Sequence, residues 1–257
     1  MPALLMVLTI TLTFSAALRE ATASPDYCEY GDETTLLLID RTTTYTPVDQ
    51  DILVAGVSRI FRELGPGDRL IARTILGDWT RSDVIYDACN AGCPDTGVLG
   101  WLTSECSSVR AKRDFIRQKS ALTRTLKELL QTPTSTTHSD IAQTLVNASK
   151  QVTARARRGA GHPLGTVAIF SDMVENSRHI PASRIRSLAP EDAFRQFERL
   201  DLIPPLATVD VVVFGFGRSQ SDNRQALDPA IKARLETTWR RLFESGAARS
   251  VQFGLQY

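Results

Sequence analysis

The sequence predicts an α/β domain in which helices flank a doubly wound, mostly parallel sheet. Three unbroken aliphatic runs, at residues 35–39, 166–170 and 209–214, have the composition of strands that are buried on both faces. Residues 69–76 and 250–255 are predicted as two further strands. The segments between these strands carry apolar residues at three- and four-residue spacing, which is typical of amphipathic helices. Strands that alternate with helices in this order indicate a single α/β domain.

Five helices are predicted, each with one apolar stripe. The first, residues 48–64, should end at Gly65-Pro66-Gly67, because neither residue type continues a helix easily. The other four are predicted at residues 109–130, 139–156, 190–200 and 229–243. Only the segment 79–106 does not fit the alternation of strands and helices. It is rich in Gly, Pro and Cys, so we expect an insertion that bridges hold in shape in place of a core.

The N-terminus has the pattern of an export signal. Residues 3–17 are uncharged and mostly apolar, and the run is shorter than the roughly 20 residues that a membrane span needs. The small residues at 21–23 suit a signal peptidase, so we predict a signal peptide at 1–23 and a mature domain at 24–257. The expected location is periplasmic or extracellular, in association with the cell envelope. The alternative is an uncleaved N-terminal membrane anchor.

The four cysteines are Cys28, Cys89, Cys93 and Cys106. An even number in an exported chain favours two disulfides, and the spacing does not fit a zinc site. Three pairings are possible, and the sequence does not choose among them. We favour a bridge from Cys28 into the insertion, since it would clamp the N-terminal arm to the domain.

Composition and motifs exclude several classes of function. The chain has 257 residues, with 30 basic and 29 acidic side chains and a formal net charge of +1. This balance lacks the basic excess of a nucleic-acid-binding protein, so no nucleic-acid partner is expected. The sequence has no Gly-x-Ser-x-Gly elbow, no Walker loop and no His-Glu-x-x-His motif. No catalytic residue is assigned, and a binding protein is favoured over an enzyme.

Two acidic residues follow buried strands directly or nearly so. Asp40 ends the run 36–39, and Asp172 comes soon after Phe170. In a doubly wound sheet, ligands bind outside the carboxyl ends of the strands. Thr42 and Thr44 follow the first Asp at alternate positions. These hard oxygen ligands suit Mg²⁺, Mn²⁺ or Ca²⁺.

Three segments resemble a known family. The stretch Asp40-Arg41-Thr42-Thr43-Thr44 resembles the Asp-x-Ser/Thr-x-Ser/Thr element of von Willebrand factor type A (VWA) domains, which opens their metal ion-dependent adhesion site (MIDAS). The stretch His138-Ser139-Asp140-Ile141 resembles the segment that supplies the lone Thr of that site. Residues 166–173, TVAIFSDM, resemble the fourth strand and the second Asp. The order of elements is similar over nearly the whole mature chain.

The resemblance implies a metal site and a mode of binding. Thr42, Thr44 and Ser139 would give hydroxyl oxygens to Mg²⁺, Mn²⁺ or Ca²⁺. Asp40 and Asp172 would act directly or through waters. An open coordination position would then take an acidic side chain from a partner protein, because an ion bound by few formal charges gains from one more carboxylate. The chain departs from the family at Ser139, where Thr is usual, and at the preceding His, where Gly is common.

Two alternatives stay open on the sequence alone. In the first, Thr42 and Ser139 cap helices in a domain that binds no metal. In the second, Asp40 and Asp172 serve a metal-dependent hydrolase similar to a phosphatase. Position 42 is Thr, however, where haloacid dehalogenase phosphatases have a second acid.

Overall fold

A computed structural model describes residues 26–42, 45–95, 106–131, 137–218 and 225–254 of the chain. The predicted signal peptide at 1–23 and one predicted metal ligand, Thr44, lie outside these ranges.

Six strands form one sheet, in the order β3-β2-β1-β4-β5-β6. All neighbouring strands run parallel except β3, which pairs with β2 in the antiparallel sense. The predicted doubly wound, mostly parallel sheet is therefore confirmed. The strands are β1 (Thr34–Asp40), β2 (Arg69–Ile75), β3 (Val84–Cys89), β4 (Leu164–Phe170), β5 (Asp210–Phe214) and β6 (Ser250–Phe253).

The five predicted helices are present, with ends that differ from the prediction by two residues or fewer. They are α1 (Pro47–Glu63), α3 (Ser108–Gln131), α4 (Ile141–Arg157), α6 (Pro190–Arg199) and α7 (Pro229–Ser245). Besides β3, the sequence did not predict three short elements, which are the 3₁₀ turns η1 (Tyr27–Tyr30) and η2 (Trp79–Arg81) and the helix α5 (Ala182–Ser187).

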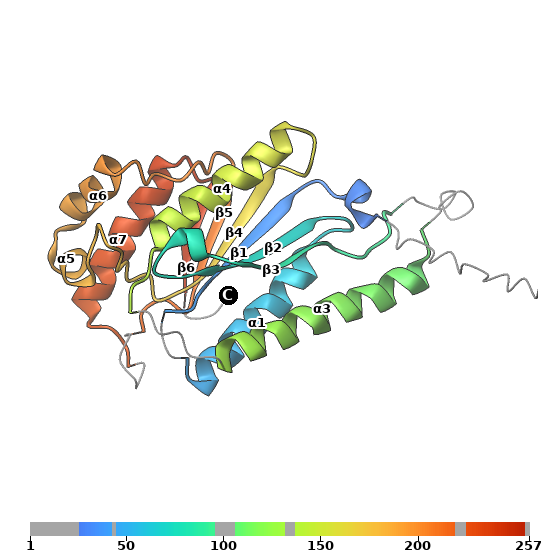
Figure 1. The fold of residues 1–257 in the computed structure, drawn as a ribbon, viewed down its shortest axis with the longest axis horizontal. Helices are drawn as coiled ribbons and strands as arrows, with labels where there is room; N and C mark the ends of the chain where they lie inside the picture. The colour runs from blue at the N-terminus through green and yellow to red at the C-terminus, as the bar shows by residue number, and fades with distance from the viewer. Residues whose placement is uncertain (1–25, 43–44, 96–105, 132–136, 219–224, 255–257) are drawn as a thin grey trace, which may run out of the picture.

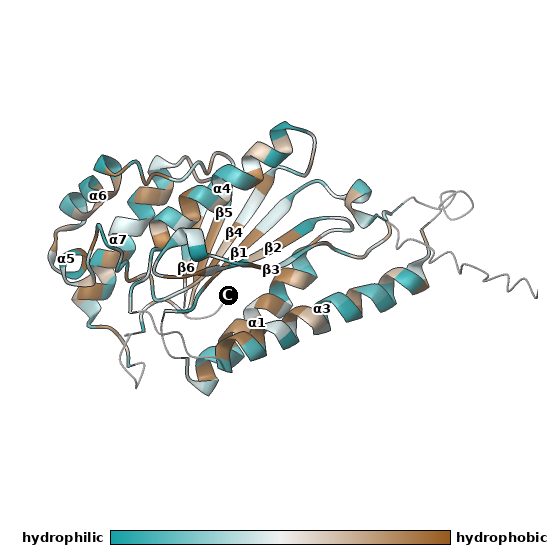
Figure 2. Ribbon diagram, viewed as in Figure 1, coloured by the Kyte–Doolittle hydropathy of each residue, from teal (hydrophilic) through white to brown (hydrophobic). Residues whose placement is uncertain are grey.

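The helices cover both faces of the sheet. α1 and α3 lie on one face, and α4, α5, α6 and α7 lie on the other (Figure 1). Each interface has its own apolar cluster: Leu37, Leu53 and Phe61 belong to the first, and Leu38 and Trp239 to the second. Figure 2 shows strongly hydrophobic residues in the central strands and also in α1. Burial on both faces explains why the sequences of these strands are continuous aliphatic runs.

The segment 79–106 is more integrated than the sequence suggests. Part of it, β3, is an edge strand of the sheet, so the expectation that the segment lacks support from the domain is wrong for residues 84–89. The strand escaped prediction because it is not an apolar run. Val84 and Asp87 are exposed, and the Asp87 carboxylate accepts a hydrogen bond from Arg69 Nε at 2.6 Å. An edge strand needs no second apolar face.

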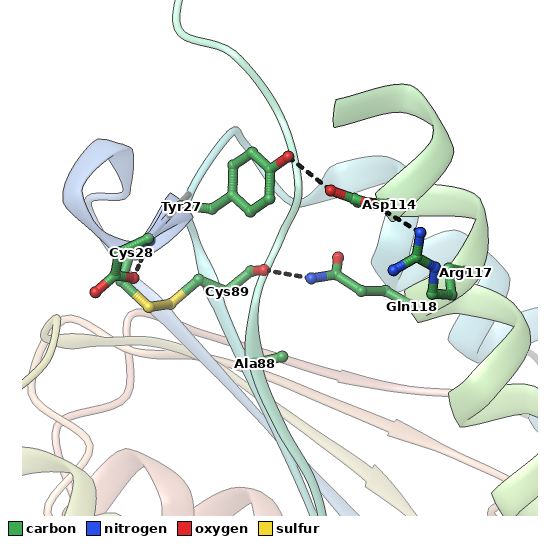
Figure 3. A pocket seen from close by; sticks show the side chains of 8 residues that line it. Tyr27, Cys28, Ala88, Cys89, Asp114, Arg117 and Gln118 are labelled. Atoms are coloured by element: carbon green, nitrogen blue, oxygen red, sulfur yellow. Dashed lines mark hydrogen bonds and ion pairs between the residues drawn. A yellow bond between two sulfur atoms is a disulfide. The ribbon is translucent and has the colours of Figure 1, made fainter. Parts of the chain in front are cut away.

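Two disulfides are present, Cys28–Cys89 and Cys93–Cys106. The first spans 61 residues and ties the N-terminal arm to β3, which confirms the favoured bridge from Cys28 into the segment 79–106. Beside this bridge, the Tyr27 hydroxyl donates to Asp114 of α3 at 3.0 Å (Figure 3). These groups line a cavity of about 310 Å³. The disulfides indicate an oxidising environment, such as the periplasm or the extracellular space.

Within the described ranges, no helix is both long enough and apolar enough to cross a bilayer.

Candidate metal centre

The candidate centre lies at the point where the winding of the sheet reverses. β1 and β4 are neighbours, but β2 continues the sheet on one side of them and β5 on the other. At such a switch point the connections leave in opposite directions and open a crevice outside the carboxyl ends of the strands. Asp40 is the last residue of β1, and Ser171 directly follows β4. The fold therefore brings both segments to the carboxyl edge of the sheet at the switch point.

Asp40 accepts four hydrogen bonds and is only 1% exposed. Its Oδ1 accepts from the backbone N–H of Thr42 at 2.9 Å and from the Thr42 hydroxyl at 2.7 Å. Its Oδ2 accepts from the hydroxyls of Ser139 at 3.0 Å and Ser171 at 2.8 Å. An ionised carboxylate offers about four lone-pair sites, so these donors satisfy it fully. Burial of this polar group is tolerated because both of its oxygens are hydrogen-bonded.

The direction of these bonds leaves the hydroxyls able to bind a cation. A hydroxyl has one proton and two lone pairs. Thr42 and Ser139 give their protons to Asp40, so their lone pairs stay available to an ion. Ser171 is less available, since its Oγ also accepts from the backbone N–H of Met173 at 2.9 Å. Asp40 thus orients the two hydroxyls, as outer-shell carboxylates orient the ligands of known metal sites.

Asp172 is placed by a tight turn after β4. Its Oδ1 accepts from the backbone N–H of Val174 at 2.9 Å, and the side chain is buried. The next residue, Met173, has φ = 61°, a left-handed conformation that is uncommon for residues other than Gly. Trp239 Nε1 donates to the Met173 carbonyl at 2.7 Å and fixes this turn. A strained residue beside a candidate ligand is held only where its surroundings determine it strongly.

Ser139 is held in place by a second pair of hydrogen bonds. Its backbone N–H donates to the Asn176 carbonyl at 3.0 Å, and the Asn176 N–H donates back to the Ser139 carbonyl at 2.9 Å. The Asn176 side chain also donates to the carbonyl of Thr137 at 2.6 Å. The loop after β4 is therefore hydrogen-bonded to the loop before α4, and this contact holds the hydroxyl of Ser139 beside Asp40.

Glu175 caps α4 from inside the protein. Its Oε2 accepts from the backbone N–H groups of Ile141 at 3.0 Å and Ala142 at 3.1 Å, and the residue is 0% exposed. Burial raises the pKa of Glu175 to about 8, and the donated hydrogen bonds lower it only in part. A neutral carboxyl group at this position still serves as an acceptor for the helix terminus.

Neither Thr42 nor Ser139 caps a helix, so the capping role that the metal-free alternative gave them is wrong. The N-cap of α1 is Thr46, whose hydroxyl accepts from the Asp49 N–H at 3.3 Å in a capping box. The first N–H groups of α4 are taken by Glu175. Both predicted ligands direct their hydroxyls to Asp40 instead.

The structure thus brings Asp40, Thr42 and Ser139 together and places Asp172 one residue beyond Ser171, which bonds to Asp40. The sequence interpretation missed Ser171, Glu175 and Asn176. Ser171 had a usable signal, a hydroxyl directly after a buried strand. The other two had none, because their partners are backbone groups more than 30 residues away.

The donor set fits a hard divalent cation. Hydroxyl and carboxylate groups are oxygen donors, which Mg²⁺ and Mn²⁺ prefer. In the part of the chain that the structure describes, no three His, Cys, Asp or Glu side chains are grouped so that they could hold an ion. An ion in this crevice would therefore depend on hydroxyl ligands and would carry few compensating protein charges.

The sequence was compared with known proteins. No protein-family model matches it, and no match is found among curated proteins. Function is therefore inferred from the fold and from the residues at this edge of the sheet.

Proposed function

We propose that the chain is an exported VWA-like binding or adaptor module that recognises a partner protein through a divalent metal ion. The observation that carries this proposal is the role of Asp40 at the switch point. This buried carboxylate accepts hydrogen bonds from the hydroxyls of Thr42, after β1, and Ser139, before α4. Because both hydroxyls donate their protons to Asp40, their lone pairs can bind a cation. Those are the positions that the resemblance to VWA domains assigns to metal ligands.

In this proposal, each residue has a distinct role. Thr42, Thr44 and Ser139 contribute hydroxyl oxygens, and Asp172 contributes a carboxylate directly or through water. Asp40 holds the hydroxyls in position. Mg²⁺ or Mn²⁺, when bound, supplies an electrophilic position for a carboxylate of the partner, since the protein ligands neutralise little of its charge.

Two features support an exported location in this proposal. The disulfides require an oxidising compartment for their formation. The apolar run at 3–17 and the small residues at 21–23 have the pattern of a secretory signal. We therefore place the mature domain, residues 24–257, in the periplasm or outside the cell.

The hydrolase alternative is less well supported. A nucleophilic Asp needs a free lone pair and access to substrate. Asp40 is buried and already accepts four hydrogen bonds. These contacts favour a structural and ligand-orienting role over a nucleophilic one.

Titration calorimetry with MnCl₂ tests the metal site. The parent should bind Mn²⁺, and Ser139→Ala should lose most of this affinity because it removes one hydroxyl ligand. Ser149→Ala is the matched control, since Ser149 is equally buried but lies further along α4. Ser139→Thr should restore binding, because it restores the hydroxyl. Equal Mn²⁺ affinity in the parent and in Ser139→Ala would contradict the proposal.

Two further assays separate binding from catalysis. The immobilised protein should capture an envelope protein in the presence of Mg²⁺ and release it when a chelator is added. Hydrolysis of p-nitrophenyl phosphate by the parent, lost in Asp172→Asn, would instead support the hydrolase.

A further inference from the structure

The longest helix, α3, carries an unusual charge. It spans 24 residues and has seven basic side chains but only two acidic ones. Its net charge is therefore +5, whereas the whole chain has a net charge of +1. The basic residues are Arg110, Lys112, Arg113, Arg117, Lys119, Arg124 and Lys127, and the acidic residues are Asp114 and Glu128. Two acids can neutralise at most two of these cations, so the helix presents a strong positive field.

The positive charge lies on the outward face of the helix. The inward face packs Leu122 and Leu126 into the apolar cluster beside α1. Six of the seven basic residues are exposed, and Lys119 is half-buried. α3 also lies outside α1, at the margin of the molecule (Figure 1). A helix of this length presents a face about 36 Å long.

Two apolar side chains stand among these cations. Val109 is 80% exposed and Ile116 is 56% exposed. The seven-residue interval between them is two helical turns, so both belong to the same outward stripe. Lys112 and Arg113 lie between them in sequence and flank this stripe. Cations around exposed aliphatic groups match an interfacial layer of charged headgroups over hydrocarbon.

We propose that the outward face of α3 docks on an anionic phospholipid surface. The charge of the helix is complementary to such a surface, and its length allows many cations to contact lipid phosphates at once.

This docking face is distinct from the candidate metal centre. Arg41, which follows Asp40, donates from Nη2 to the carbonyl of Leu129 at 3.2 Å. The C-terminal end of α3 therefore lies near the crevice, while its outward stripe faces away from the apolar cluster. Lipid binding by this face needs no metal, so the two proposals can fail independently.

Vesicle co-sedimentation in the presence of a chelator tests the proposal. The full protein is mixed with vesicles of phosphatidylcholine alone, or of phosphatidylcholine with 30 mol% phosphatidylglycerol, at about 0.1 M salt, where screening acts over about 10 Å. We expect strong preference for the anionic vesicles and its loss at high salt. The neutral vesicles measure any binding that does not depend on lipid charge.

Two charge-matched variants identify the surface. The α3 variant carries Lys112→Gln, Arg113→Gln, Arg124→Gln and Lys127→Gln. The control carries Arg157→Gln, Arg158→Gln, Arg184→Gln and Arg199→Gln, which removes the same charge from other exposed positions. Each cation near an anionic surface strengthens partitioning about fivefold, so the α3 variant should bind anionic vesicles at least about 100-fold more weakly. The control should change by less than about threefold.

Three results would overturn the proposal. They are equal binding to neutral and anionic vesicles, an equal loss in both variants, and unchanged binding in an α3 variant whose circular dichroism is native. Retention on immobilised polyglutamate without any vesicle binding would assign this face to an acidic protein, and it would overturn the membrane proposal as well.

Discussion

Replacing Glu175 with Gln should remove the fall in the free energy of unfolding that the Glu175 carboxyl group causes as the pH rises to neutrality. Glu175 is fully buried, and burial raises its pKa from 4.5 to about 8 in the folded protein. Between these two pH values the folded chain holds a proton that the unfolded chain releases. The free energy of unfolding therefore falls as pH rises across this interval, and the contribution of Glu175 is constant below and above it.

The size of the effect follows from the two pKa values. Each pH unit between 4.5 and about 8 lowers the free energy of unfolding by about 1.4 kcal/mol, or on the order of 5 kcal/mol in total. Gln carries no titrating proton, and its side-chain oxygen can still accept from the N–H groups of Ile141 and Ala142. The variant should therefore match the parent near pH 4.5 and exceed it by about 3 kcal/mol at pH 7.

Urea denaturation at several pH values between 4.5 and 8 measures the difference. Glu198→Gln, at an exposed position on α6, is the control and should follow the pH profile of the parent. A Glu175→Gln profile parallel to that of the parent, or a variant less stable than the parent at pH 7, would refute the reasoning. A parallel profile would mean that the folded protein does not retain the Glu175 proton across this pH interval.

Two further predictions concern the disulfides and the central carboxylate. Replacing Cys28 and Cys89 with Ser should lower the free energy of unfolding by about 4 kcal/mol. Replacing Cys93 and Cys106 with Ser should lower it by about 3 kcal/mol, because this bridge closes a shorter loop. Urea denaturation measures both values, and a larger loss for the second pair would contradict the loop argument. Asp40→Ala should lower the melting temperature measurably, because it leaves three hydroxyls and one N–H without their acceptor. An unchanged melting temperature would show that these hydrogen bonds contribute little to stability.

The central part of the fold could be predicted from the sequence because burial leaves a strong pattern. β1, β4 and β5 are covered on both faces, and their sequences are continuous aliphatic runs. β3 could not be predicted in the same way, since an edge strand with an exposed Asp87 has no such pattern. The pairing Cys28–Cys89 stayed one of several choices until the position of β3 placed these residues together.

The candidate site was predictable only in part, for a similar reason. Asp40, Thr42 and Ser139 belong to local motifs at the ends of predicted elements, so their neighbourhood followed from the sheet topology. Glu175 and Asn176 form hydrogen bonds with backbone groups of a segment distant in sequence. Because almost every residue type carries these backbone groups, such contacts cannot be recognised from the sequence. The sequence therefore indicated the hydroxyls that face the crevice but not the residues that hold them there.

The most direct test of the metal proposal is a crystal structure from crystals soaked in MnCl₂, with anomalous data collected to locate manganese. The account predicts one strong anomalous peak in the crevice, within about 2.5 Å of the hydroxyl oxygens of Thr42 and Ser139. Absence of a peak there at millimolar Mn²⁺, or manganese bound by a different set of residues, would contradict it.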